Sequence, residues 1–509
     1  MTLVLRPPCI NLQNPSRAKV ISGLIKIKSR NSLLANSAAF LLGLIGSAAS
    51  VAAPVLEEVV VTAQLRAQSL QDVPVSVNAV SGDKLFEAGI EKVEDLQAYI
   101  PNLTMSETGI GTNIYVRGIG SGINQGFEQS VGLYFDGVSY GRAQLSRAPF
   151  MDLARVEVLR GPQNILYGKS SIAGALSLIS RRPGEEFEGL VSLTVEPNEK
   201  ERVYDLVLSG PITDSFGVRL ASRVKTTEGY IENLTLDRNE PQRREETVRL
   251  VFDWAVADNI QAMLKVEQSD FNVKGRQIEI INDQESVSTT PGFTGNTYAE
   301  ILDETTIGTF SVDSDSSVLN NTLDFKRSSN GDESNNNIGA YILNVEMNAG
   351  EHTFTSISAY LEYDFQEVCD CDFTGADLFT VDLLEDYSQF SQELRWVSPA
   401  GGRFEYIGGL YYQTSDLKFF DSINVRTDTI PDLINLADAA GAGERGELFD
   451  GIGDAGDELR DFGTPRNFTT EAELYTAFLQ STMKMSDNLR LTLGGRFSYE
   501  KKEGSRSLD

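Results

Sequence analysis

Few residues of this sequence could carry out covalent chemistry. The chain of 509 residues contains a single histidine, His352, and it has neither a GxSxG nor an HExxH motif. A serine–histidine–aspartate set or a histidine-ligated metal would depend on that one residue. The sequence therefore predicts a protein that is not an enzyme and that has no metal site of its own.

Two cysteines form the second group with chemical potential. Cys369 and Cys371 are separated by one residue in the sequence CDCD. In an oxidising compartment they could form a local disulfide, and they could equally remain unpaired. A zinc site is not predicted, because no second pair of ligands occurs at a suitable spacing.

Two arginines stand at the ends of strands that are predicted to be buried. The segment 155–183 reads as two strands, 156–160 and 174–180, and Arg160 closes the first of them. Arg117 likewise ends a strand and precedes a glycine. A buried guanidinium is costly unless a carboxylate pairs with it. We therefore expect both arginines to have acidic partners elsewhere in the chain.

These strands belong to a predicted α+β unit that covers about residues 57–185. Ser81 is a suitable N-cap for a helix that Gly89 ends. Asp136 and Gly137 lie between two apolar runs and predict a two-residue hairpin. The mixture of short helices and strands indicates a small folded unit ahead of the longer second part of the chain.

An extended segment opens this unit. Residues 57–63 read EEVVVTA, and four of the seven side chains are β-branched. This composition favours a strand. A strand without a local partner is free to add to a sheet edge of another protein, whereas an ordinary first strand would pair within the unit. The segment alone leaves both interpretations open.

The second part of the chain reads as a series of strands in which apolar and polar residues alternate. Short turns and long connections, such as 228–243 and 273–336, alternate between them. This sorting is typical of transmembrane β-barrels, which have short periplasmic turns and long external loops. An odd strand number would leave an open edge in lipid, so we expect an incomplete barrel. The eleven strands are predicted at 189–197, 200–210, 216–227, 244–256, 260–272, 337–347, 352–365, 387–397, 404–416, 473–485 and 489–500.

The N-terminus has the organisation of an export signal. Basic residues precede the apolar stretch 33–45, and small residues follow it. This order is typical of a secretory signal peptide, and we expect cleavage after Ala52.

The charge of the chain limits its partners. The net charge is −29, which argues against nucleic acid, because its phosphates would be repelled. Acidic loops would suit a cationic ligand, and they would equally suit divalent cations bound to lipopolysaccharide.

The order and spacing of several motifs resemble the TonB-dependent outer-membrane receptors. The segment EEVVVTA is similar to the family's TonB box. Successive motifs of the family's plug domain and barrel are similar to 72–77, 114–118, 132–138, 155–180, 391–395 and 408–411. One departure is Ala173, which stands where the family usually carries the first glycine of a pair.

The resemblance implies an N-terminal α+β plug domain followed by an antiparallel transmembrane β-barrel. The expected domains are a signal peptide at 1–52, a tether with the TonB box at 53–66, the plug at 67–185 and the first part of the barrel at 186–509. A plugged barrel of this type has about 22 strands, so the chain would contain about 11 of them.

The resemblance also implies roles for single residues. Arg117 and Arg160 of the plug would pair with Glu393 and Glu473 of the barrel, either as a movable latch or as a static contact. The residues that bind TonB would be Glu57, Glu58, Val59, Val60, Val61, Thr62 and Ala63. The ligand-facing apex of the plug would comprise Gly118, Gly120, Gly122, Phe127, Tyr134 and Tyr140.

The function that the resemblance implies is active transport of a scarce ligand across the outer membrane of a Gram-negative bacterium. The family default is a ferric siderophore, with iron as part of the ligand and with no cofactor. TonB and its inner-membrane ExbB/ExbD motor would supply the work, and lipid and lipopolysaccharide would surround the barrel. Cobalamin, a glycan or an aromatic compound is an alternative ligand, and a non-functional truncated receptor is a further alternative.

Overall fold

The computed structural model describes most of the chain with several gaps. The described residues are 2–5, 21–28, 60–62, 64–66, 68–69, 71, 73–108, 111–121, 128–147, 150–198, 200–285, 287, 295, 297, 299, 315–375, 379–425, 462–486 and 488–508. The predicted apolar stretch 33–45 and the cleavage site after Ala52 lie outside them. So do six predicted site residues, Glu57, Glu58, Val59, Ala63, Gly122 and Phe127.

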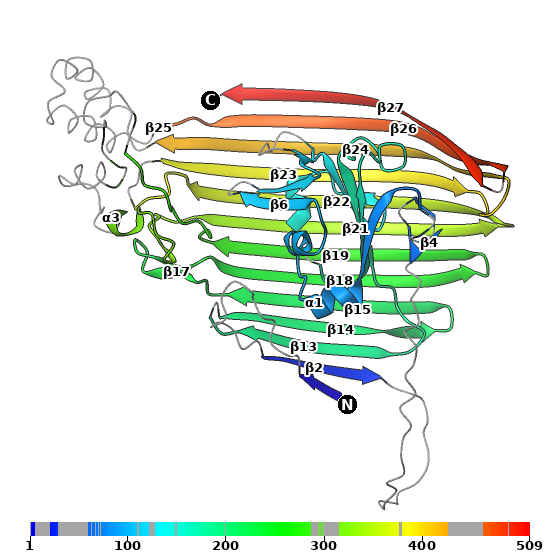
Figure 1. Ribbon diagram of the computed structural model, residues 1–509, viewed down its shortest axis with the longest axis horizontal. Helices are drawn as coiled ribbons and strands as arrows, with labels where there is room; N and C mark the ends of the chain where they lie inside the picture. Colours follow the sequence, from blue (N-terminus) through cyan, green and yellow to red (C-terminus); the bar gives the residue numbers. More distant parts are fainter. Residues whose placement is uncertain are drawn as a thin grey trace, which may run out of the picture.

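Eleven long strands follow one another as antiparallel neighbours and form a single large sheet, here called the wall (Figure 1). They are β13 (Glu188–Glu196), β14 (Glu201–Thr213), β15 (Phe216–Thr227), β18 (Gln242–Ala257), β19 (Ile260–Lys274), β21 (Glu333–Ala349), β22 (His352–Asp370), β23 (Phe379–Val397), β24 (Phe404–Val425), β26 (Arg466–Ser486) and β27 (Leu489–Leu508). The predicted strands and their order are confirmed. Several are longer than predicted at the end that carries the long loops, because hydrogen-bonded pairing between neighbouring strands continues there.

The two faces of the wall differ in the way that a membrane strand requires. On β14, Tyr204, Leu206 and Leu208 are exposed, whereas the intervening Asp205 and Val207 are buried. A strand of a soluble sheet would normally expose its polar side chains to water, but here the apolar side chains are the exposed ones. Transmembrane β-barrels have this alternation, with apolar residues toward lipid and polar residues toward the lumen.

Two short strands from the N-terminus extend the same sheet. They are β1 (Thr2–Leu5) and β2 (Ile21–Lys28), and β2 pairs antiparallel with β13. An edge strand presents unpaired N–H and C=O groups that readily accept another strand. Residues of the predicted signal peptide thus occupy the free edge of the wall, and their removal by cleavage stays a prediction.

A smaller α+β unit, here called the plug, lies against one face of the wall (Figure 1). Its central sheet has the order β10-β9-β12-β11-β5, and a second sheet has the order β6-β7-β8. The strands are β5 (Ser76–Ser81), β6 (Leu103–Thr108), β7 (Gly111–Val116), β8 (Ile119–Gly120), β9 (Val131–Phe135), β10 (Val138–Ser139), β11 (Leu153–Arg160) and β12 (Gly174–Ser180). The helices are α1 (Gly82–Ala88) and the 3₁₀ helices η1 (Val93–Ala98) and η2 (Ala143–Arg147).

The local sequence signals in the plug act as predicted. Ser81 accepts a hydrogen bond from the backbone N–H of Lys84 at 3.3 Å, and Gly89 ends α1 with φ 68°. Asp136 and Gly137 have φ of 50° and 86°, the positive values that a type I′ hairpin turn requires. The Asp136–Gly137 turn places β10 beside β9, and β9 in turn pairs parallel with β12, so that the strands of the segment 155–183 lie in the middle of the central sheet.

The long loops of the wall fold together at one end. Three strands from two loops form a small sheet: β16 (Ile231–Asn233) and β17 (Arg238–Glu240) from the loop between β15 and β18, and β20 (Lys326–Arg327) from the loop between β19 and β21. The helix α3 (Asp315–Val318) lies in the same loops, and β25 (Phe462–Gly463) pairs with β24. None of the helices in the described part of the chain has the length and hydropathy needed to span a bilayer.

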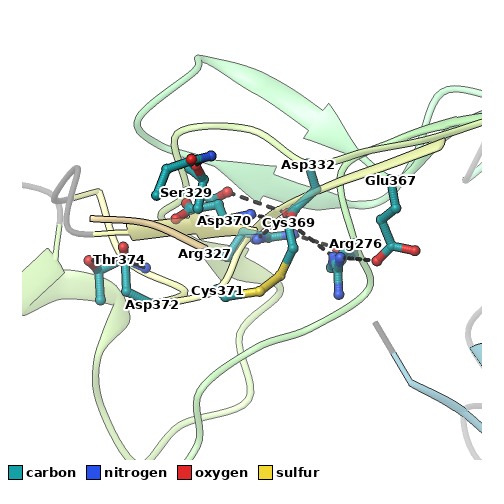
Figure 2. The surroundings of a disulfide bond; sticks show 12 residues. Arg276, Arg327, Ser329, Asp332, Glu367, Cys369, Asp370, Cys371, Asp372 and Thr374 are labelled. Atoms are coloured by element: carbon teal, nitrogen blue, oxygen red, sulfur yellow. Dashed lines mark hydrogen bonds and ion pairs between the residues drawn. A yellow bond between two sulfur atoms is a disulfide. The ribbon is translucent and has the colours of Figure 1, made fainter. Parts of the chain in front are cut away.

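Cys369 and Cys371 are joined by a disulfide at the end of β22 (Figure 2). The residue between them, Asp370, donates its backbone N–H to Asp332 at 3.0 Å and accepts from the backbone N–H of Asn330 at 2.7 Å. The sequence had left the pairing of these cysteines open. In the structure the disulfide turn is tied to the neighbouring external loop.

Candidate functional site

The predicted contact between Arg160 and Glu393 does not form in the structure. Arg160 instead donates to the carbonyl oxygen of Pro101 at 3.1 Å and to the side chain of Asn78. Glu393 pairs with Arg395, two residues along the same strand, at 2.9 Å. The prediction was wrong about the partner because Arg160 is in register with β5 and turns toward that strand rather than toward the wall.

The other two members of the predicted latch are exposed. Arg117 lies in a turn with φ 53°, and Glu473 is an exposed residue of β26. Exposed side chains have no need of a buried partner, so the reason for pairing them disappears. Whether any of these residues affects movement of the plug stays a prediction.

On strands β15 to β19, the charges that join plug and wall have the opposite arrangement to the predicted one. For the buried charges, the wall supplies the cations and the plug supplies the oxygens, whereas the exposed Arg182 of the plug pairs with Asp253 of the wall. Arg219 makes two hydrogen bonds of 2.6 Å to the carboxylate of Asp152. The Lys265 ammonium lies 3.0 Å from Asp136 and is fully inaccessible to solvent. Such deeply buried ion pairs are difficult to separate, because each partner would then be a buried charge without a counter-ion.

Arg249 of the wall is the third buried cation on this side. It donates to the carbonyl oxygen of Met151 in the plug and pairs with Glu267 of the wall. The Phe135 ring of the plug lies beneath two cations, with its centroid 4.8 Å from the Arg249 guanidinium and 3.4 Å from the Lys265 ammonium. Cation–π contacts of this kind are strongest where water is excluded.

A plug arginine does reach a wall glutamate, but it is Arg142. Its guanidinium lies 3.4 Å from Glu385 on β23, and its Nε donates to the Tyr363 hydroxyl at 3.3 Å. The same hydroxyl donates to Glu385 at 2.6 Å, and Gln144 adds a bond of 3.3 Å. Sequence reasoning missed this residue because Arg142 follows the Asp136 hairpin in a turn, and no strand pattern marks it.

The described part of the TonB-box segment is docked on the plug. The strand β3 (Val60–Val61) pairs with β4 (Gln68–Ser69). Thr62 donates both its backbone N–H (2.8 Å) and its hydroxyl (3.1 Å) to one oxygen of Glu157 in β11. Val61 is fully buried in a cluster with Tyr134, Leu159 and Ala175. In this structure the segment therefore pairs locally, as an ordinary first strand would.

The predicted ligand-facing apex is only partly at the surface. Gly118 is exposed in its turn, and Gly120 is partly buried in β8. Tyr134 and Tyr140 were predicted to belong to the ligand-facing apex, but they are only 5% and 1% exposed and do not lie at the surface of the plug, although Tyr134 lines the cavity between the plug and the wall. The Tyr134 hydroxyl is held inside the plug by the carbonyl oxygen of Tyr167 and by Ser171. Aromatic residues at these positions fill the core of the plug.

A cavity of about 680 Å³ separates the plug from the middle strands of the wall. At the end with the long loops it is lined by Glu128, Arg142 and Lys169. At the end with the short turns it is lined by Thr62, Arg66 and Ser398. The cavity therefore extends along the plug from the loop side to the docked segment.

The comparisons with known proteins agree with this architecture. The family model of the TonB-dependent receptor plug domain matches residues 69–175. The iron-regulated outer membrane virulence protein of Vibrio cholerae is 29% identical over 177 residues, which are 32% of this chain and 27% of that protein. The pesticin receptor of Yersinia pestis is 32% identical over 142 residues, 28% of this chain and 21% of that protein.

Solved structures share the fold over a larger part of the chain. The ferric yersiniabactin uptake receptor of Yersinia pestis has 18% identity and a TM-score of 0.65, over 86% of this chain and 60% of its own. The ferripyoverdine receptor of Pseudomonas aeruginosa, bound to ferripyoverdine, has 16% identity and a TM-score of 0.64, over 88% and 55%. The chain thus spans less than two thirds of these receptors. Residues 69–175 thus match the plug domain of the TonB-dependent receptors, and the plug and the wall together have the fold of the Gram-negative outer-membrane receptors to which the chain is similar.

Proposed function

We propose that this chain takes part in the TonB-dependent uptake of a ferric siderophore. The observation that carries the proposal is the match of residues 69–175 to the TonB-dependent receptor plug domain, directly after a segment that is similar to the TonB box. The residues Val61 and Thr62 of that segment dock on the plug, as an ordinary first strand also would. The matched relatives are named for iron regulation and for siderophore receptors, which supports iron as the cargo.

The mechanism follows from the two ends of the plug. The ligand binds among the external loops and on the loop side of the plug, where Arg142 and Lys169 lie. Binding weakens the hold on Val61 and Thr62, and the segment enters the periplasm. There it adds as a strand to TonB through main-chain hydrogen bonds. Work from the ExbB/ExbD motor then displaces part of the plug.

Iron uptake with and without TonB tests this function. Cells that express the receptor are given radioactive iron as a series of ferric siderophores, and we expect uptake that requires both the receptor and TonB. Val61→Pro should abolish uptake, because proline removes the N–H that strand addition uses, but ferric siderophore binding to whole cells should remain. Val61→Ile, which keeps the N–H and the β-branched side chain, is the matched control.

Two outcomes would contradict the proposal. Uptake that persists in cells without TonB would remove the energy source. Uptake of cobalamin, a glycan or an aromatic compound, with no ferric chelate transported, would keep the TonB-dependent mechanism and reject the siderophore. Iron starvation should induce the receptor only if iron is the cargo.

A further inference from the structure

The disulfide between Cys369 and Cys371 contributes little to the stability of the whole chain, because it closes a very short loop. The two cysteines are only two positions apart. A disulfide stabilises a fold mainly by constraining the unfolded chain, and this effect grows with the number of residues that it encloses. What this disulfide can fix is the local turn at the end of β22, with Asp370 at its centre (Figure 2).

Asp370 connects this turn to the loop between β19 and β21. Its side chain is buried, and one carboxylate oxygen accepts the backbone N–H of Asn330 at 2.7 Å. The backbone N–H of Asp370 donates to Asp332 at 3.0 Å. The Asn330 side chain also donates to the carbonyl oxygen of Gly375 at 3.2 Å. The neighbouring loop therefore contacts the chain on both sides of Cys371.

Asp332 and Arg327 extend this network to the loop between β15 and β18. Asp332 pairs with Arg276 at 3.0 Å and with Arg327 at 2.9 Å. Arg327 also pairs with Glu240 of β17 at 3.2 Å. Asp332, Arg327 and Glu240 are all buried, so movement of one loop would leave buried charges of the others without partners. The described residues of these loops are here called the loop cluster: 228–241, 275–285, 315–332 and 371–375.

The two sulfur atoms differ in their access to solvent. Cys369 is 2% exposed, whereas Cys371 is partly exposed. An external thiolate therefore attacks the sulfur of Cys371. The S–S bond breaks, and the Cys369 thiolate leaves and takes up a proton. A second thiol molecule attacks the external sulfur of the mixed disulfide and releases the Cys371 thiol. In total the protein disulfide is reduced to two thiols, and two molecules of the external thiol are oxidised to their disulfide.

We propose that the Cys369–Cys371 disulfide is a site of thiol–disulfide exchange that controls the loop cluster, with a low-molecular-weight thiol as its reaction partner. Reduction frees the turn around Asp370, the hydrogen bonds to Asn330 and Asp332 are lost, and the loops separate. The wall strands and the plug keep their structure, because the disulfide encloses so few residues. The loop cluster is therefore closed in oxidising surroundings and open in reducing ones.

The loop cluster also borders the plug. Arg276 and Asp332 line a cavity of about 180 Å³ together with Glu367 of β22 and Arg147 of the plug. Arg276 pairs with Glu367 as well as with Asp332. Opening of the loop cluster therefore removes part of the lining of this cavity.

Thiol labelling tests whether the disulfide exchanges in the folded protein. The receptor is purified in detergent and incubated with reduced glutathione in the absence of denaturant, and the thiols formed are blocked with a maleimide. Mass spectrometry follows the peptide that carries both Cys369 and Cys371, so that Cys9 does not contribute. We expect both cysteines to be modified. A peptide that stays oxidised until denaturant is added would overturn the proposal.

Trypsin tests whether reduction opens the loop cluster. Arg327 is buried in β20, so trypsin can cleave after it only when the loops have separated. We expect reduction to raise the rate of this cleavage on the order of tenfold, since hydrogen bonds to charged groups are lost. Oxidised glutathione should restore the protection. Arg403, exposed in the short turn between β23 and β24 at the opposite end of the wall, is the internal control, and cleavage after it should not change.

Two variants separate the disulfide from general loosening. Cys369→Ser combined with Cys371→Ser should be cleaved rapidly after Arg327 without any thiol and should not respond to glutathione. Asp370→Ala, which keeps the disulfide but loses the bond to Asn330, should also be cleaved faster. Unchanged cleavage after Arg327 in the fully reduced receptor, or a rise that Arg403 shares, would overturn the proposal. Because no measurement involves TonB or a siderophore, failure of the proposed function would show in the uptake experiment and not here.

Discussion

The plug meets the wall differently on its two sides. Along β15 to β19, three buried wall cations hold plug oxygens, and the cavity beside α1 measures about 180 Å³. Along β21 to β24, the cavity is about 680 Å³, and the contacts gather at its two ends, at Arg142 and at Arg66. The first side resembles the interior of a packed protein. The second has room for a change of position.

The difference indicates on which side the wall holds the plug more tightly. Breaking a buried ion pair costs more free energy than breaking a solvent-exposed one, because the charge that remains is not solvated by water. Arg142 and Glu385 on the side of the cavity are about as deeply buried as Arg219 and Asp152, so the two sides differ in the number of buried contacts and in the size of the cavity rather than in the exposure of their ion pairs.

The largest effect is expected from Asp136→Asn, on the side at β15 to β19. Asparagine tolerates the positive φ of the hairpin, so the turn is kept while the charge is lost. Lys265, fully inaccessible to solvent, then loses its nearest carboxylate. We expect a loss of about 3–5 kcal/mol in the free energy of unfolding of the plug, measured by denaturant unfolding in detergent.

A charge-neutral double variant gives the control for this prediction. Combining Asp136→Asn with Lys265→Met removes both charges, and most of the lost stability should return, because no uncompensated ion stays buried. If the single variant changes stability by less than about 0.5 kcal/mol, as an ordinary surface substitution does, the side at β15 to β19 is not held by this pair.

A smaller effect is expected from Arg142→Gln, on the side of the cavity. Glu385 is fully buried but keeps hydrogen bonds from Tyr363 and Gln144 after the arginine is gone. The expected loss is about 1–2 kcal/mol by the same unfolding measurement. Arg181→Gln, which breaks the more exposed pair with Asp83, should change stability by less than about 0.5 kcal/mol. A loss at Arg142 that equals the loss at Asp136 would erase the difference between the two sides.

The sequence predicted the elements well because their signals are local. Alternation along a strand, the Ser81 cap and the Asp136–Gly137 turn depend on neighbours in the chain, and each was confirmed. The long connections between wall strands marked one end of the sheet, although the strands run further into that end than predicted. The disulfide between Cys369 and Cys371 was open in the sequence, since proximity along the chain permits pairing without requiring it.

The partners across the interface could not be predicted because they depend on how two sheets face each other. Asp152 and Arg219 are 67 residues apart, and nothing in the chain between them indicates their contact. A buried arginine correctly implied a polar partner, but Arg160 found an amide and a carbonyl within the plug rather than a distant carboxylate. Tyr134 and Tyr140 were misplaced for a similar reason, since an aromatic residue near a loop can pack inward or outward.

The smallest expected effect concerns the predicted latch itself. Arg160→Ala and Glu393→Ala should have additive effects on the free energy of unfolding, within about 0.5 kcal/mol, because the two side chains have different partners. The matched cycle on Arg142 and Glu385, which are in contact, should give an interaction energy of about 0.5–3 kcal/mol. A clear interaction between Arg160 and Glu393 would mean that the plug reaches the middle of β23 in another state.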